Sequence, residues 1–206
     1  KAELLGAMLH MGNESNLRKL LVGRGWAVLD DNKEMDTAKW DTFIDRMIGE
    51  GVLTKADFDF LQSVWDMTEE MKPLAQKAHQ EIYGYYFNEV EAVPITNRFG
   101  TFRGGYVPAK TDPFMVRDAQ RNAKLEELEG DFRQALPSTG NGFTKGRVEY
   151  NQPLSLDVRL MTKHIDDVLR FSYLQPAIKD VTKILRNRQF ADNLTAIDPG
   201  AIEEML

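Results

Sequence analysis

The fold is decided by residues 54–86, which read TKADFDFLQSVWDMTEEMKPLAQKAHQEIYGYY. Thr54 and Asp57 resemble a capping box, in which two polar side chains at a helix start satisfy free backbone amides, although Glu or Gln is usual where Asp57 stands. Beyond them, apolar residues recur at helical spacing to about Tyr86, which predicts a helix of about 48 Å. Pro73 lies inside this stretch and should kink the helix or break it into two.

A second long helix is predicted near the end of the chain, over 155–190. Its apolar residues recur every three or four positions, which is typical of an amphipathic helix, in spite of Pro176. They are Met161, Ile165, Val168, Phe171, Leu174, Ile178, Val181 and Leu185. The two long helices carry the longest apolar stripes of the chain, so we expect these stripes to pack together and hold the domain.

The rest of the chain also shows mostly helix signals, with one exception. Residues 91–110 are rich in β-branched, aromatic and glycine residues, which predicts a small hairpin or meander. The predicted fold class is therefore mainly α: a helical domain built on two long amphipathic helices with a small central β element. We expect a single domain over 1–206, made of a helical part at 1–90, a β insertion at 91–110, helices at 113–136 and 155–190, and the start of a following helix at 198–206.

The two ends suggest a piece of a longer polypeptide. The chain begins with Lys1 rather than Met, directly in an apolar helical pattern. Near the other end, Asp198 and Pro199 resemble a helix start, yet only a few residues follow them. We therefore expect further domains on one or both sides.

The composition excludes several classes of protein. Hydrophobic residues make up 42% of the chain and charged residues 28%, which is ordinary for a globular protein and excludes wholesale disorder. Without cysteine, the chain can form neither a disulfide scaffold nor a thiolate zinc site. The net charge of −6 argues against a dedicated duplex-DNA-binding protein, and no apolar run is long enough for a membrane-spanning segment.

No motif indicates catalysis. The three histidines are far apart and none belongs to a His-Glu-x-x-His pattern, so we expect no metal site. The glycine pair Gly104–Gly105 lacks the Gly-Lys-Ser/Thr ending of a phosphate-binding loop, and no Gly-x-Ser-x-Gly sequence occurs. We therefore expect no catalytic residue and no cofactor; enzymatic domains would lie elsewhere in the parent polypeptide.

Two groups of residues are candidates for binding. Arg103 and Tyr106 flank the glycine pair, which either permits a tight turn or presents an exposed Arg–aromatic edge that could anchor an interface. The second group is basic, and consists of Lys145, Arg147, Lys179, Lys183, Arg186 and Arg188. Lys179, Lys183, Arg186 and Arg188 lie near the end of a predicted helix, where they could complement the helix dipole. Alternatively, all six residues bind nucleic acid or an acidic partner.

The charge distribution makes this second group stand out. Residues 28–92 contain 15 Asp and Glu against 6 Lys and Arg, whereas residues 143–190 contain 9 Lys and Arg against 5 acidic residues. A clustered basic surface can contact phosphates even on an acidic protein.

Six short segments also carry a family resemblance: His10-Met-Gly-Asn13, Asn16-Leu-x-x-Leu20-Leu21, Leu53-Thr54-Lys55-x-Asp57, Gln62-x-x-Trp65, Phe99-Gly-x-x-Arg103-Gly-Gly-Tyr106-x-Pro108 and Leu154-Ser-Leu-Asp157. Together they resemble the large polyvalent protein–associated domains of bacteriophages and other mobile elements, over nearly the whole chain. Such domains are segments of very large multidomain proteins, some of which are packaged in the virion and delivered with the genome. The resemblance implies this setting and brings no catalytic residues with it.

These observations lead to two hypotheses of function. The first is a non-catalytic structural and interaction module of a large phage protein, located in the virion or the host bacterial cytoplasm. Its partners would be flanking domains of the same polypeptide and other phage or host proteins. The alternative is a nucleic-acid-contacting module that binds delivered or host DNA weakly and without sequence preference. A third, weaker hypothesis is an enzyme whose active site is completed by flanking domains.

Overall fold

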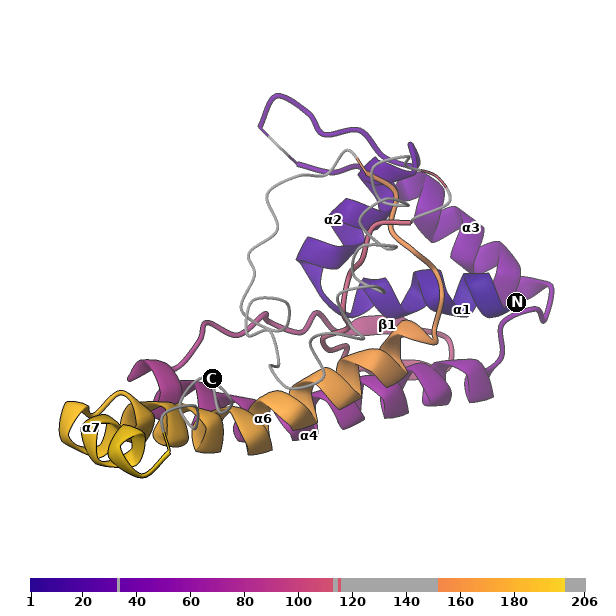
Figure 1. Ribbon diagram of the computed structural model, residues 1–206. Helices are drawn as coiled ribbons and strands as arrows, with labels where there is room; N and C mark the ends of the chain where they lie inside the picture. The colour runs from indigo at the N-terminus through magenta and orange to yellow at the C-terminus, as the bar shows by residue number, and fades with distance from the viewer. Residues whose placement is uncertain (33, 113–114, 116–151, 199–206) are drawn as a thin grey trace.

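The computed structural model describes residues 1–32, 34–112, 115 and 152–198 (Figure 1). The described chain is mostly helical and contains one small antiparallel sheet of two strands, which confirms the predicted fold class at this level. The elements are α1 (Ala2–Leu9), the 3-10 turn η1 (His10–Gly12), α2 (Glu14–Gly23), α3 (Ala38–Gly49), α4 (Lys55–Tyr83), β1 (Ile95–Asn97), β2 (Gly100–Phe102), α6 (Leu160–Leu185) and α7 (Arg188–Ile197). The helices expected at 113–136 and 198–206 lie, except for Met115 and Asp198, outside the described residues.

Helix α4 begins as predicted. The amide of Thr54 donates to Asp57 Oδ2 at 2.8 Å, and the Thr54 side chain accepts from the Asp57 amide, so the capping box is complete. The helix then continues unbroken through Pro73 for 29 residues, so the predicted division into two helices is wrong. Buried residues on both sides of the proline, such as Thr68 and Ala75, pack the two halves against the rest of the molecule. This packing outweighs the backbone hydrogen bond that proline removes.

The chain turns back at the end of α4. Gly84 adopts a φ of 86°, a left-handed conformation that ends the helix three residues before the expected position. The Gln76 side chain then pairs with both backbone groups of Phe87, because Phe87 N donates to Oε1 at 2.9 Å and Nε2 donates to Phe87 O at 2.8 Å. The segment that follows therefore runs back along α4.

Polar side chains of α4 hold this returning segment. Thr68 Oγ1 donates to the carbonyl of Tyr106 at 2.7 Å, and Glu69 Oε1 accepts from the Tyr106 amide at 3.1 Å. Gln62 Oε1 accepts from the amide of Arg103 at 2.6 Å. These bonds satisfy backbone groups that have no strand partner, so an extended segment can be buried without joining a sheet.

The β insertion is a two-stranded hairpin rather than a meander. Only β1 and β2 pair, with Ile95 opposite Phe102 and Asn97 opposite Gly100. The stretch at 106–109 is buried but forms no strand, because its backbone is held by side chains of the helices instead.

A junction of two glycines and a tryptophan joins the N-terminal helices to α4. The carbonyl of Gly12 accepts from the amides of Val93 and Gly105, both at 2.9 Å. The fully buried Trp65 lies beneath them and donates from Nε1 to the carbonyl of Leu9 at 3.0 Å. A Cβ placed on Gly12 would lie 2.6 Å from the Trp65 ring, and one on Gly105 would lie 2.6 Å from Trp65 Cβ. Only glycine therefore fits at both positions.

Two asparagines extend the junction. Asn13 caps α2 by accepting the Asn16 amide at 2.9 Å, and its Nδ2 donates to the carbonyl of Gly105 at 3.3 Å. Asn16 Nδ2 donates to the carbonyl of Val107 at 2.8 Å. The start of α2 is thereby fastened to the same segment that α4 holds from its other side.

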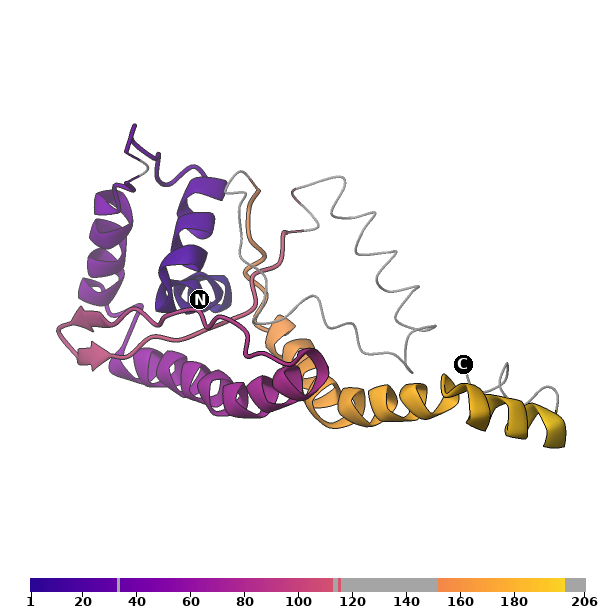
Figure 2. The same ribbon diagram turned by 90° about the vertical axis from the view of Figure 1, so that its left-hand side faces the viewer.

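Helix α6 is shorter than predicted and lies beside α4 (Figures 1 and 2). It begins at Leu160 rather than near Ser155, because Ser155 donates its amide to Lys110 O at 2.8 Å in an extended connection. It ends at Leu185, and α7 follows as a separate helix. Val168 shares a buried cluster with Ala75 of α4, so the first half of α6 packs as expected.

The predicted apolar stripe of α6 does not face α4 over its whole length. Met161 and Val168 are buried, whereas Leu174 is 46% and Val181 55% exposed. The stripe advances by about 3.4 residues per step, less than the 3.6 residues of a helical turn, so it rotates by about 120° around the helix between its first and last residues. The structure therefore does not show two amphipathic helices that face each other over their whole length.

The main core does not lie between α4 and α6. It joins α1, α2, α3 and the first half of α4, and takes only Met161 from α6. A second, smaller cluster combines Ala75, Phe87, Tyr106 and Val168. None of the described helices is both long and apolar enough to cross a membrane.

Replacing Gly12 with Ala should destabilise the protein by about 1–3 kcal/mol, because the new methyl group has no space between Trp65 and Gly105. Gly49→Ala is the matched control: this glycine ends α3 with nothing within 4 Å of its Cβ position. It should change stability by less than about 1 kcal/mol. Urea denaturation of both variants provides the measurement, and equal midpoints would contradict the role of the junction.

Candidate functional site

The glycine pair forms a turn and not an exposed Arg–aromatic edge. Tyr106 is only 4% exposed and lies in the second core cluster, with its ring centroid 5.6 Å from that of His164. The interpretation of Tyr106 as a surface anchor is therefore wrong, because α4 holds its backbone and its ring points inward. Gly104 has a φ of 75°, as a turn requires, and a Cβ there would collide with the carbonyls of Val93 and Gly12.

Arg103 remains at the surface. Its Nη2 donates to Asp66 Oδ1 of α4 at 2.7 Å, while its amide donates to Gln62. The guanidinium is largely exposed, so this ion pair contributes little to stability. Arg103 and Tyr106 thus belong to one turn, but only Arg103 is accessible to a partner.

The basic residues divide into three groups. Lys145 and Arg147 lie outside the described residues. Lys179 has a structural contact: its Nζ donates to the carbonyl of Glu81 at 3.2 Å and to that of Ile82. A cation at the last carbonyls of a helix is favoured by the helix dipole. Lys179 therefore lies at the carboxyl end of α4, whereas the dipole interpretation concerned the end of its own helix.

The third group lies where α6 meets α7. Lys183 pairs with Asp180 at 3.0 Å and Arg188 with Asp192 at 3.9 Å, in exposed pairs of little energy. Arg186 is exposed at the end of α6. These three cations remain accessible, each within a turn or two of an acidic residue.

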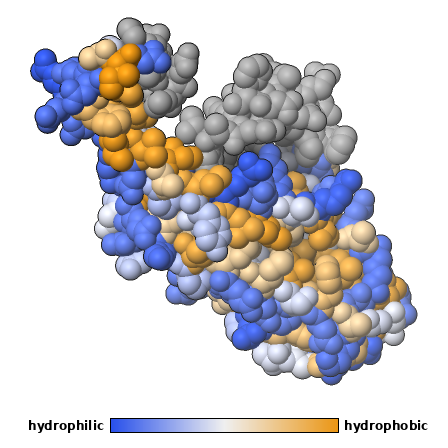
Figure 3. Space-filling view, turned by 60° about the horizontal axis from the view of Figure 1, so that its bottom comes forward, coloured by the Kyte–Doolittle hydropathy of each residue, from blue (hydrophilic) through white to orange (hydrophobic). Residues whose placement is uncertain are grey.

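An apolar surface beside these cations is the feature that sequence reasoning missed. We call the second half of α6, from Tyr173, together with α7 the arm; Figure 2 shows it extending beyond the rest of the described structure. Its exposed apolar residues are Tyr173, Leu174, Val181, Ile184, Phe190 and Ile197. Figure 3 shows hydrophobic surface continuing along the arm. Helix α7 contains no buried residue at all.

The apolar residues of α6 occupy two opposite sides of the helix. At 100° per residue, Tyr173, Val181 and Ile184 lie about 140–220° around the helix from Val168, which faces α4. The exposed side therefore points away from the body of the molecule. The spacing of Phe190, Leu194 and Ile197 in α7 could have revealed a further apolar face, because four and three residues are helical steps.

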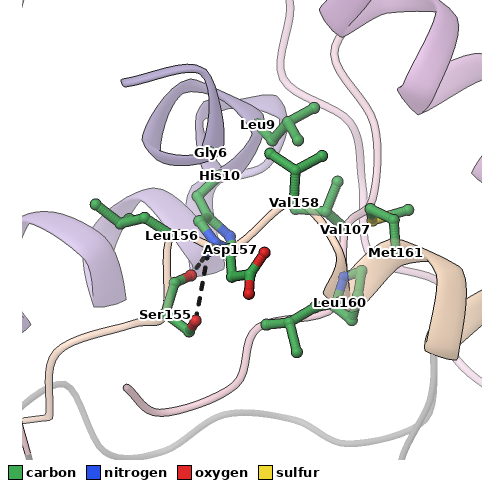
Figure 4. Close-up of a pocket in the computed structure, with 11 residues that line it drawn as sticks. Gly6, Leu9, His10, Val107, Ser155, Leu156, Asp157, Val158, Leu160 and Met161 are labelled. Carbon is green, nitrogen blue, oxygen red and sulfur yellow. Dashed lines mark hydrogen bonds between the residues drawn. The ribbon is translucent and has the colours of Figure 1, made fainter. Parts of the chain in front are cut away.

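A pocket lies between α1 and the connection before α6 (Figure 4). It has a volume of about 260 Å³, open solvent at its mouth included, and contains Ser155, His10 and Asp157, the residue types of a serine hydrolase triad. Their geometry is different. His10 Nε2 lies 3.4 Å from the backbone carbonyl of Ser155, and Ser155 Oγ accepts from the amide of Asp157 at 3.4 Å.

The electrostatics of this pocket argue against Asp157 as a proton donor, and the contact of the serine argues against an activated nucleophile. Hydrogen bonds from the side chain and amide of Arg159 lower the pKa of Asp157, so it stays an anionic acceptor. The serine hydroxyl is aimed at a backbone amide and not at an imidazole, so no activated nucleophile results. Across the described ranges, no three His, Asp or Glu residues are placed to hold a metal ion.

Comparison with known proteins finds no matching family model, no matching curated protein and no matching solved structure. The resemblance to large polyvalent protein–associated domains stays a prediction from its motifs. The structure assigns structural contacts to several of their residues, namely Gly12, Asn13, Asn16, Asp57, Gln62, Trp65 and Gly105.

The contact of Lys179 provides a test of its role. Lys179→Met should lower stability by about 1 kcal/mol, because the carbonyls at the end of α4 lose a charged donor. Lys183→Met, one turn further along and paired with exposed Asp180, should change it by less than about 0.5 kcal/mol. Thermal denaturation of the two variants measures the difference. If the two variants were equally stable, the contact of Lys179 with α4 would contribute nothing to stability.

Proposed function

We propose that this chain is a non-catalytic interaction module that binds a protein partner through the apolar side of the arm. The exposed side chains of Tyr173, Val181 and Ile184 support the proposal most directly, because they form one continuous side of a helix that faces away from the core. Contiguous apolar surface of this kind is typical of interaction sites in soluble proteins.

The proposed setting is a large phage protein, carried in the virion or acting in the host bacterial cytoplasm. The motif residues quoted above are its only support. In that setting, a projecting arm would contact either a flanking domain of the same polypeptide or another phage or host protein.

Site-specific photocrosslinking tests the interaction. A photoreactive amino acid at position 181, in the native polypeptide and the cells that produce it, should form covalent adducts with protein. The same residue at position 28 is the control, because Val28 is 80% exposed but lies in a loop far from the arm in the chain. Adducts at neither position, or equal adducts at both, would refute the proposal.

A second candidate function is contact with nucleic acid, supported by the exposure of Lys183, Arg186 and Arg188 at the junction of α6 and α7. With Lys179 engaged at α4, the three remaining cations are expected to make three phosphate contacts. Binding should therefore be weak, independent of sequence and steeply dependent on salt, with a log–log slope of roughly −2 to −3.

An anisotropy titration with single- and double-stranded DNA at about 50 mM salt measures this binding. Replacing Lys183, Arg186 and Arg188 with Glu should abolish it, because the cations that displace counterions from the phosphates are lost. The same change at Lys39 and Lys55, in the acidic half, should have little effect. Absence of binding by the unaltered chain would exclude the nucleic-acid function.

A further inference from the structure

We propose that the arm is hinged: it undocks from the end of α4 by bending at Pro176, near its start, while the first half of α6 stays packed on α4. The proposal follows from the polar side that the arm turns to α4, from the position of the proline and from the contact of Lys179. It concerns how the arm is attached to the molecule, so it holds or fails independently of any partner of the arm.

The side of α6 that faces α4 changes from apolar to polar along the helix. At 100° per residue, the residues that follow Val168 within about 40° of its direction are Ser172, Gln175, Lys179 and Thr182. All four are polar. The docked part of the arm therefore gains little from burying apolar surface against α4.

Two buried polar atoms on this side lack a hydrogen bond. Ser172 Oγ and Gln175 Oε1 are shielded from solvent, and neither has a hydrogen-bond partner in the described part of the chain. A buried polar atom without a partner lowers stability, and the loss is recovered when water reaches it. Both residues lie in the helical turn that ends at Pro176, so bending at this turn would bring water to them.

Pro176 provides the place to bend. It has no amide hydrogen, so the carbonyl of Ser172 lacks its helical partner. Pro73 interrupts α4 in the same way, but the buried residues Thr68 and Ala75 hold that helix on both sides of its proline. Beyond Pro176, the residues that face α4 are only half-buried, so α6 is firmly held on one side of its proline alone.

Lys179 acts as the latch of the docked arm. Its Nζ donates to the carbonyls of Glu81 and Ile82, where the dipole of α4 favours a cation. The neighbouring Thr182 hydroxyl instead donates to the carbonyl of Ile178 in its own helix, at 2.7 Å. Helix α7 adds no buried residue to the docked arm. Docking therefore depends strongly on a single side chain.

Electron–electron spin-label distances in the full chain test the hinge, because a chain without cysteine can be labelled at chosen positions. Labels at Gln80→Cys in α4 and Lys183→Cys in the arm should show a docked population and a second one at longer distance. Labels at Gln80→Cys and Lys163→Cys are the control pair, because Lys163 lies in the first half of α6. This pair should show one narrow distribution.

Three variants of the first labelled pair test the cause. Lys179→Met should raise the ratio of the longer to the docked population about fivefold, because the latch is lost. Gln175→Leu and Pro176→Ala should lower it, since the first replaces an unpartnered oxygen by an apolar group and the second restores the helical hydrogen bond. Lys77→Met is the matched control, an exposed lysine that pairs with Glu81 of its own helix, and should leave the ratio unchanged.

Two results would overturn the hinge. The first is a single narrow distribution that is the same for the unaltered chain, Lys179→Met and Lys77→Met, which would show that the arm stays docked without its latch. The second is a control pair that broadens as much as the test pair, which would show that the whole of α6 leaves α4. Neither result bears on photoadducts at position 181, so failure of the hinge is distinguishable from failure of the proposed function.

Discussion

The carbonyl of Gly12 accepts two backbone amides, and the arrangement of the N-terminal part depends on this contact. It brings the turn between α1 and α2 against Val93 and Gly105, directly over the buried ring of Trp65. Because no side chain fits between these backbones, the segment after β2 comes close enough for the polar residues of α4 and α2 to satisfy its amides and carbonyls. The helical core and the extended segment are thereby joined through backbone groups that bond to side chains of the helices.

The sequence predicted the elements that local chemistry determines and missed those that tertiary contacts determine. The capping box at Thr54 and the asparagine cap of α2 involve residues three positions apart, so both are visible in the sequence. The junction joins positions 12, 65, 93 and 105, and a glycine that is needed for close approach looks in the sequence like any turn glycine. The helix through Pro73 was mispredicted for the same reason, because packing on both of its sides is not a local property.

The sequence predicted the residue types of the candidate site but not their contacts. A cluster of cations near the end of α6 was evident from the charge pattern, but the contact of Lys179 with α4 depends on how two helices lie side by side. Tyr106 follows the glycine pair in the sequence, and one of the two interpretations of that pair placed it at the surface, whereas its backbone bonds to Thr68 and Glu69 turn its ring inward. The apolar side of the arm was missed because apolar residues at helical spacing predict a core, and the sequence does not show on which side the core lies.

The drift of the apolar stripe in α6 explains how one helix serves both the core and the surface. A spacing of about 3.4 residues per step keeps a stripe in contact with a partner only if the two helices wind around each other. Helix α4 ends at Tyr83, where Lys179 meets its last carbonyls, so beyond that point it offers no surface for α6 to follow. Leu185 at the end of α6 is buried, but Val181 and Ile184 are exposed past Lys179, and packing on α4 does not explain them. The proposed protein partner rests on this observation: α6 keeps an exposed apolar side where its intramolecular partner has ended.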